Sequence, residues 1–498
     1  MENFYIKTRK FDKLGVLIFS LLFITVGFLQ SCSLTFGKLI ISCVQWPAVA
    51  LGCLIILERL INFKHYIKTR GIILLVFFAL SYVASSFWTM RYGWYENVRF
   101  LVFMVFQFGI LYATDAEQNP DESKKLLTVC SAYYLVGTSV LSLLSFVFMF
   151  AGYSKIFYPD IGAEGPIYYI GFMNGRLFGA YWDPNIAATM AAVAIVISIY
   201  FIINSKKIAV RFLCVLSAVL ELLYLTFSDS RTGRLCIIAG ILFFTLLMAF
   251  KHRFFVRKSA QAAAACAVLI VSVAAACFLP TLIKNGYNAY VKYQIRHDNT
   301  EINNNSEADN DKTDEDSATG ESSDGSAAQP PEIPEDVFDR GYDMSEDISN
   351  RRFDIWKSAV EIWKSSPVFG ISRANVLPYV DDNLPDSYLI NNDHMRFDSM
   401  HNMYFEILAC QGAVGIILFI AFIVYVIAGI FKYGKYLWKH EDFPLFALII
   451  GIAAAVCMST LVMAEIVYVV SPISTLFWLA IGCLNHYISH SRLTKEEK

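Results

Sequence analysis

The sequence predicts an all-α polytopic membrane protein with about twelve transmembrane helices and one long extracytoplasmic loop. The first observation is composition: 56% of the 498 residues are hydrophobic and only 17% are charged, whereas a soluble domain has about 25% charged residues. The second is a series of apolar runs, each of roughly 17–25 residues and long enough to cross a hydrocarbon core of about 30 Å. The third is an uneven distribution of basic residues between the segments that join these runs.

The predicted spans fall into two groups, separated by the long loop at 281–400. Nine precede the loop, within residues 1–280, and three follow it, within 401–484. They are 14–30, 38–57, 71–88, 98–114, 126–151, 184–203, 208–227, 233–250, 259–280, 413–431, 444–463 and 466–484. The first run has no small-residue cleavage site and further spans follow it, so we interpret it as an anchor and not as a signal peptide.

The basic residues predict the orientation in the membrane. With the N-terminus inside, the cytoplasmic segments contain 23 of the 41 lysines and arginines, and the short outer loops contain seven. The remaining eleven lie in the long loop, which the positive-inside rule does not count. We therefore expect a multi-pass protein of the cytoplasmic membrane, with both termini in the cytoplasm and the long loop outside.

The first half of the long loop is strongly acidic. Between His297 and Asp347 the sequence has seventeen acidic and two basic residues, with Asn, Ser, Gly and Pro among the rest. Such a composition buries too little apolar surface to offset the entropy of ordering. We expect a disordered acidic insert at about 298–345.

The second half of the loop contains a predicted helix at 349–366. Its pattern places Phe353, Trp356, Val360 and Trp363 on one face. Ser349 or Asn350 can cap its start, and Pro367 with Gly370 marks its end. Tryptophan and basic residues beside an apolar face are typical of a helix that lies at a membrane interface.

Cysteine spacing indicates neither a disulfide framework nor a metal centre. The chain has eleven cysteines and no CxxC pair, so we expect no metal and no cofactor. Nothing in the composition points to a nucleic-acid partner. The partner that the composition does predict is the lipid bilayer.

The candidate site consists of basic and proton-transferring residues on the predicted outer side: Arg176, Arg231, the adjacent Arg351 and Arg352, and His401. Arginine suits a pyrophosphate because its planar fork donates paired hydrogen bonds and stays charged. Histidine can accept a proton from an attacking hydroxyl near pH 7. Each also has an ordinary interpretation: a headgroup contact for the arginines of short loops, a helix terminus for Arg351 and Arg352, and a structural role for His401.

Four short motifs occur in a fixed order, and together they resemble the O-antigen ligase and O-antigen polymerase family. They run from Arg176 to Asn185, from Ser230 to Gly233, from Arg352 to Gly370 and from His401 to Gly415. The resemblance covers about residues 165–430. The acidic insert before Arg351 is not part of the family pattern.

The resemblance implies a membrane enzyme like the C-type glycosyltransferases. Its donor would be a glycan on undecaprenyl pyrophosphate, and its acceptor a glycan or a lipid core. By motif, His401 matches the essential histidine, while Arg231 and Arg176 match arginines of the family. Arg352 matches the loop arginine less securely, because Arg351 is adjacent. The resemblance also implies a flippase and a chain-length regulator as partners.

Three alternatives remain at this point. The enzyme could be a ligase instead of a polymerase, because the motifs do not specify the acceptor. Twelve spans with both termini inside are also typical of a polysaccharide flippase or another transporter, which would bind substrate near the middle of the membrane. A purely structural membrane protein is the third. The clustering of candidates outside spans that are nearly free of charge, apart from Glu221 and a few residues at their ends, favours the transferase.

Overall fold

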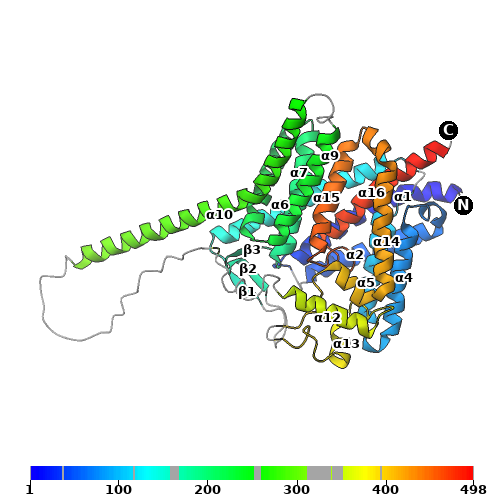
Figure 1. Cartoon of the computed structure of the whole chain (residues 1–498), viewed down its shortest axis with the longest axis horizontal. Coiled ribbons are helices and arrows are strands. Elements are labelled where there is room, and N and C mark those ends of the chain that lie inside the picture. Colours follow the sequence, from blue (N-terminus) through cyan, green and yellow to red (C-terminus); the bar gives the residue numbers. More distant parts are fainter. Residues whose placement is uncertain are drawn as a thin grey trace.

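A computed structural model of the chain describes residues 2–35, 39–115, 118–157, 168–251, 259–310, 338, 351–392 and 395–496. Helices dominate it, as predicted, and most of them pack side by side in one bundle (Figure 1). Two small elements lie among the long helices, α3 (Phe63–Tyr66) and η1 (Met90–Tyr92).

Eight helices within these ranges are long and apolar enough to cross a membrane, and each contains most of a predicted span. They are α1 (Glu2–Ser31), α2 (Leu39–Ile61), α6 (Asp121–Phe150), α7 (Pro184–Asn204), α8 (Ile208–Phe227), α9 (Arg231–Lys251), α14 (Met403–Lys439) and α15 (Phe443–Thr460). The prediction of a polytopic helical protein is therefore confirmed at this level.

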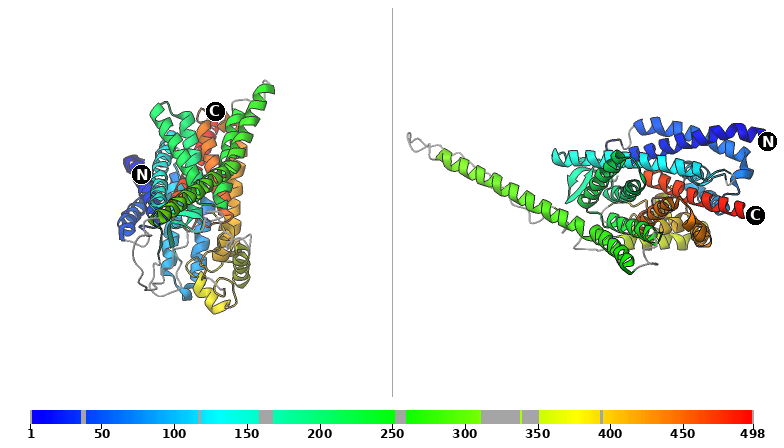
Figure 2. Two further views of the ribbon diagram at one scale, coloured as in Figure 1. Left: turned by 90° about the vertical axis from the view of Figure 1, so that its left-hand side faces the viewer. Right: turned by 90° about the horizontal axis from the view of Figure 1, so that it is seen from above.

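The other four predicted spans take different forms. α4 (Ile72–Trp88) is apolar but shorter, and α5 (Tyr95–Phe106) passes into a π-helical turn, η2 (Gln107–Tyr112). The predicted span at 259–280 is the first part of a helix of 52 residues, α10 (Ser259–Asn310), which projects away from the bundle (Figures 1 and 2). α10 continues through 298–310, where disorder was expected. The rest of the predicted insert, apart from Phe338, lies outside the described residues.

The predicted span at 466–484 begins later, because residues 461–471 are not helical and α16 runs from Pro472 to Glu496. A residue before proline avoids the helical conformation, which explains the start at Pro472. The irregular segment packs inside the bundle: the Tyr468 hydroxyl donates to Gln411 Oε1 (2.6 Å), and Gln107 Nε2 donates to the carbonyl of Val469 (2.9 Å). Such contacts supply the hydrogen bonds that an irregular backbone needs among membrane helices.

A small antiparallel sheet corrects the expectation of an all-α fold. Its strands are β1 (Lys155–Phe157), β2 (Tyr168–Met173) and β3 (Arg176–Gly179), in the order β1-β2-β3. β2 and β3 form a hairpin in which Met173 pairs with Arg176 across the turn Asn174-Gly175. Both turn residues have positive φ, 52° and 67°, as in the two-residue turns whose twist suits a hairpin.

Two helices of the predicted loop lie beside the sheet at one end of the bundle (Figure 1). They are α12 (Arg352–Ser365) and α13 (Val376–Asn383). α12 packs on α14 and buries Ile355, Ala359 and Ile362. The buried face is thus not the predicted aromatic one, since Phe353 is 66% exposed. The proposed cap residues Ser349 and Asn350 lie outside the described residues.

The segment after α12 is inserted into a break in α14. Gly412 interrupts this helix with φ 62° and ψ −160°. At the break, the amides of Ile371 and Ser372 donate to the carbonyls of Ala409 and Cys410 (3.0 and 2.9 Å). A Cβ at Gly412 would lie 2.4 Å from the carbonyl oxygen of Val368, so glycine is needed for this close approach.

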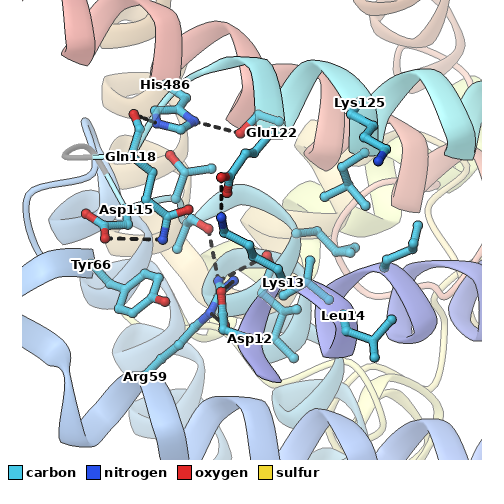
Figure 3. Close-up of a pocket in the computed structure, with 18 of the residues that line it drawn as sticks. Asp12, Lys13, Leu14, Arg59, Tyr66, Asp115, Gln118, Glu122, Lys125 and His486 are labelled. Atoms are coloured by element: carbon cyan, nitrogen blue, oxygen red, sulfur yellow. Dashed lines mark hydrogen bonds and ion pairs between the residues drawn. The ribbon is translucent and has the colours of Figure 1, made fainter. Parts of the chain in front are cut away.

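A polar pocket of about 420 Å³ lies at the opposite end of the bundle (Figure 3). There the buried Arg59 pairs with Asp12 (2.9 Å) and donates to the carbonyls of Gly109 and Ala113 (2.6 and 2.9 Å). Lys13 is paired with Glu122. Because these charges are satisfied by one another and by the C-terminal end of η2, we interpret the pocket as a structural junction of α1, α2 and η2.

Candidate active site

Five segments of the chain meet at the end of the bundle that carries the sheet and α12. They are the hairpin β2–β3, the N-termini of α7 and α9, the start of α12, and the turn before α14. α7 and α9 lie side by side there, because the Ser230 hydroxyl donates to Asn185 Oδ1 (3.0 Å). Unpaired backbone N–H groups and the helix dipole make the N-terminus of a helix favourable for anions.

Arg176 is fixed between the hairpin and the two helices. Its Nε donates to the carbonyl of Ser228 (2.8 Å), and its Nη2 donates to Asn185 Oδ1 (3.0 Å). Asp183 caps α7 by accepting from the amide of Asn185 (2.7 Å), with Pro184 at the first helical position. Asp183-Pro-Asn185 thus forms a turn and the start of α7, and Asn185 also links Arg176 to Ser230.

His401 lies immediately before α14, in an unusual backbone conformation. Its φ is +46°, a left-handed value that costs a non-glycine residue about 1–3 kcal/mol unless its surroundings enforce it. The next residue, Asn402, caps the helix by accepting from the amides of Tyr404 and Phe405 (2.9 and 3.2 Å). The imidazole is partly exposed, and its ring packs edge-on to Phe397.

The charges around His401 show which predicted residues share its environment. Burial lowers the pKa of His401, and the positive charge of Arg352 lowers it further, while the carboxylates of Asp183 and Asp398 oppose both effects. Burial likewise lowers the pKa of Arg352, Asp183 opposes this, and the nearby charge of Arg231 lowers it further. The imidazole is therefore neutral near pH 7, beside a cluster of positive charge.

The adjacent arginines of α12 have different surroundings. Arg352, the first residue of the helix, is the one whose charge acts on His401. Arg351 precedes the helix with φ 64°, and its Nη1 donates to the hydroxyl of Tyr388 (3.5 Å). The structure thus brings together Arg352, Arg231 and His401, and places Arg351 against the loop that follows α13.

Two charged residues beside His401 were missed in the sequence. Arg373 and Glu406 form an ion pair (2.7 Å) in which the Glu406 side chain is fully buried. The available signal was Glu406 itself, since a carboxylate in the first turn of an apolar helix needs a cationic partner. The identity of that partner was not predictable, because Arg373 lies in an irregular loop.

Within the described ranges, no three His, Cys, Asp or Glu side chains are grouped so that they could hold a metal ion. Every cysteine described is free. The polar groups at the site are guanidinium groups, an imidazole, hydroxyls, amides and the carboxylates of Asp183 and Asp398.

The fold and this site define a polytopic membrane protein with a cationic, histidine-containing site at one end of its helices. Residues 215–420 match the family model described as O-antigen ligase. This match agrees with the resemblance to that family inferred from the motifs. The match includes Arg231, Arg352 and His401 and begins after Arg176. No curated protein matches the chain.

Proposed function

We propose that this protein is a membrane glycosyltransferase that moves a glycan from undecaprenyl pyrophosphate to a hydroxyl of a second glycan or of a lipid core. The O-antigen ligase domain supports a ligase- or polymerase-type membrane function. The observation that supports the finer proposal is that Arg352 acts electrostatically on His401 and Arg231 acts on Arg352, although the three residues come from distant segments.

The arginines and the helix N-termini suit a pyrophosphate leaving group. Arg352 begins α12 and Arg231 begins α9, where Arg231 is exposed. Pyrophosphate gains negative charge as its bond to the anomeric carbon breaks, so fixed donors aimed at it stabilise the transition state more than the ground state. Arg176 holds Asn185 and the carbonyl of Ser228, and thereby also supports this region.

His401 supplies the base in this mechanism. The acceptor hydroxyl oxygen attacks the anomeric carbon, the bond from that carbon to the pyrophosphate oxygen breaks, and the hydroxyl proton passes to the neutral imidazole. Undecaprenyl pyrophosphate leaves as an anion paired with the arginines, and the imidazolium then releases its proton to solvent. Burial and Arg352 favour the neutral form that this step requires.

We further propose that the site faces the outer side of the cytoplasmic membrane, where a flippase would deliver the donor and a chain-length regulator would act on the product. The excess of basic residues in the opposite segments supports this orientation. Polymerase and ligase differ only in the acceptor, and both use the chemistry above.

The test is His401→Ala in cells that make the protein's glycan. General-base catalysis is worth about 10²–10⁴ in rate, so polymer or ligated glycan should disappear from gels while the lipid-linked donor accumulates. His394→Ala, a histidine of the same predicted loop that belongs to no motif, is the control. Normal product from His401→Ala at normal protein levels would contradict the mechanism.

A second experiment separates the transferase from a transporter. Purified protein in detergent micelles, which enclose no compartment, is given the lipid-linked glycan extracted from the His401→Ala cells together with the lipid core of those cells as a second acceptor. A transferase releases undecaprenyl pyrophosphate and forms a longer or newly attached glycan. A transporter leaves the lipid-linked glycan unchanged under these conditions.

A further inference from the structure

A buried ion pair, Arg373–Glu406, holds the turn before His401, and the charge of its arginine also lowers the pKa of His401. Arg373 Nε is 2.7 Å from Glu406 Oε1, with the Glu406 side chain fully buried and that of Arg373 15% exposed. Burying two charges is seldom more stabilising than burying an apolar pair of similar size. Stability alone therefore does not explain the pair, and we examine which neighbouring backbone its two side chains hold in place.

The backbone around Arg373 is hydrogen-bonded to residues of α4 and α5 and of the turn between them. Its amide donates to the Tyr82 hydroxyl (3.3 Å), and the amide of Ala374 donates to Asn97 Oδ1 (3.1 Å). Asn375 Nδ2 donates to the hydroxyl of Thr89 (2.9 Å). Together with the insertion of the preceding residues at the Gly412 break, these bonds fix the backbone from which Arg373 reaches toward His401.

Arg373 and Glu406 hold the turn before His401 from two sides. Arg373 Nη1 donates to the carbonyl of Asp398 (2.7 Å), and its Nη2 lies 3.4 Å from the Asp398 carboxylate. Glu406 Oε2 accepts from the amide of Met400 (2.6 Å) and from the hydroxyl of Ser399 (3.1 Å). The Ser399 hydroxyl in turn accepts from the amide of His401 (3.3 Å).

We propose that Arg373 and Glu406 are positioning residues that hold the turn 398–401 and so keep the imidazole of His401 aimed at the acceptor. The left-handed backbone of His401 is a strained conformation, which persists only where its surroundings over-determine it. The ion pair supplies that constraint, because each partner binds a different part of the turn. This inference rests on the proposed role of His401 as the base.

The first variants remove the charge of one partner at a time. Glu406→Gln keeps the size of the side chain and an acceptor oxygen. Arg373→Gln removes the guanidinium group. Since a displacement of about 1 Å costs on the order of 10²-fold in rate, we expect kcat to fall about tenfold to hundredfold with KM nearly unchanged. Arg373→Lys should recover part of this loss. Arg396→Gln, which breaks the exposed Arg396–Asp381 pair of the same loop, is the control and should leave kcat unchanged.

A double variant distinguishes positioning from simple stabilisation. Arg373→Met with Glu406→Leu leaves no unpaired buried charge, so the protein should fold with a Tm near that of the natural chain. This variant still lacks the two side chains that hold the turn 398–401, so kcat should remain low. Recovery of kcat together with Tm would overturn the proposal, because the pair would then only stabilise the fold.

Proteolysis measures the mobility of the turn without depending on glycan transfer. Chymotrypsin cleavage after Phe397, whose ring contacts His401, should become faster in Glu406→Gln and Arg373→Gln but not in Arg396→Gln. Unchanged cleavage and unchanged kcat would overturn the positioning role while leaving His401 as the base. If His401→Ala is active but cleavage still responds to the ion pair, the transfer mechanism fails and the constraint on the turn stands.

Discussion

At the scale of single residues, the neighbours Arg351 and Arg352 differ more than their sequence position suggests. Arg352 lowers the pKa of His401, whereas Arg351 reaches the hydroxyl of Tyr388. The sequence left the choice between them open, because adjacent residues at a helix start cannot be told apart by periodicity. The backbone decides it: Arg351 takes φ 64° outside the helix, and Arg352 is its first residue.

This difference predicts a shift in the pH dependence of transfer. Arg352 favours neutral His401, so Arg352→Gln should raise the pKa of His401 and leave the base protonated up to a higher pH. The acidic limb of kcat/KM against pH should therefore move upward, in addition to an overall loss of activity. Arg351→Gln is the matched control, and an equal shift in both variants would contradict the assignment.

Arginine geometry yields a second prediction at this scale. Arg176 bridges the carbonyl of Ser228 and Asn185 Oδ1 with two different nitrogens of its fork. A lysine keeps the charge but cannot span both acceptors. Arg176→Lys and Arg231→Lys should each reduce transfer by more than the retained charge suggests, by about tenfold to 150-fold if one charge-assisted hydrogen bond worth about 1.5–3 kcal/mol is lost. Near-normal transfer by both variants would contradict a role for these two arginines in transfer.

At the scale of elements, the hairpin that carries Arg176 could have been found in the sequence. Asn174-Gly175 between aromatic-rich runs is the strongest short signal for a hairpin. The twelve-span interpretation obscured it, because a short outer loop was assigned no structure. The break in α14 could not be found in this way: Gly412 lies directly before the predicted span 413–431, and only the insertion of Val368 and its neighbours requires it to be non-helical.

The break predicts opposite effects for two glycines of the same helix. Gly412→Ala would force a left-handed alanine whose Cβ lies 2.4 Å from the Val368 carbonyl, so we expect Tm in detergent to fall. Gly434→Ala meets no atom within 4 Å, and alanine favours a helix by about 0.5–1 kcal/mol, so Tm should stay or rise. A Gly412→Ala protein as stable as the natural chain would show that the break is not needed.

At the scale of the whole molecule, the length of the apolar runs predicted most of the membrane helices. It did not predict where these helices begin and end. Eight predicted spans correspond to span-length helices, because about twenty apolar residues have few alternatives in a bilayer. The segment 461–471 was misassigned because its apolar residues are buried against protein, where an irregular backbone is satisfied by Gln107 and by others. The candidate site was predictable as a set of residues, but its supporting pair was not, since Arg373 and Glu406 meet only through the tertiary fold.

The predicted orientation of the protein in the membrane can be tested by labelling. The 23 basic residues of the predicted inner segments, against seven in the short outer loops, predict that the end that carries α12 and His401 lies outside. In a cysteine-free background, Asp386→Cys lies at that end and Lys206→Cys lies in the predicted inner turn between α7 and α8, and both positions are exposed. An impermeant maleimide added to intact cells should label Asp386→Cys and spare Lys206→Cys, while both should react in opened membranes. The reverse pattern would place the arginines and His401 in the cytoplasm, where a donor delivered by a flippase could not reach them.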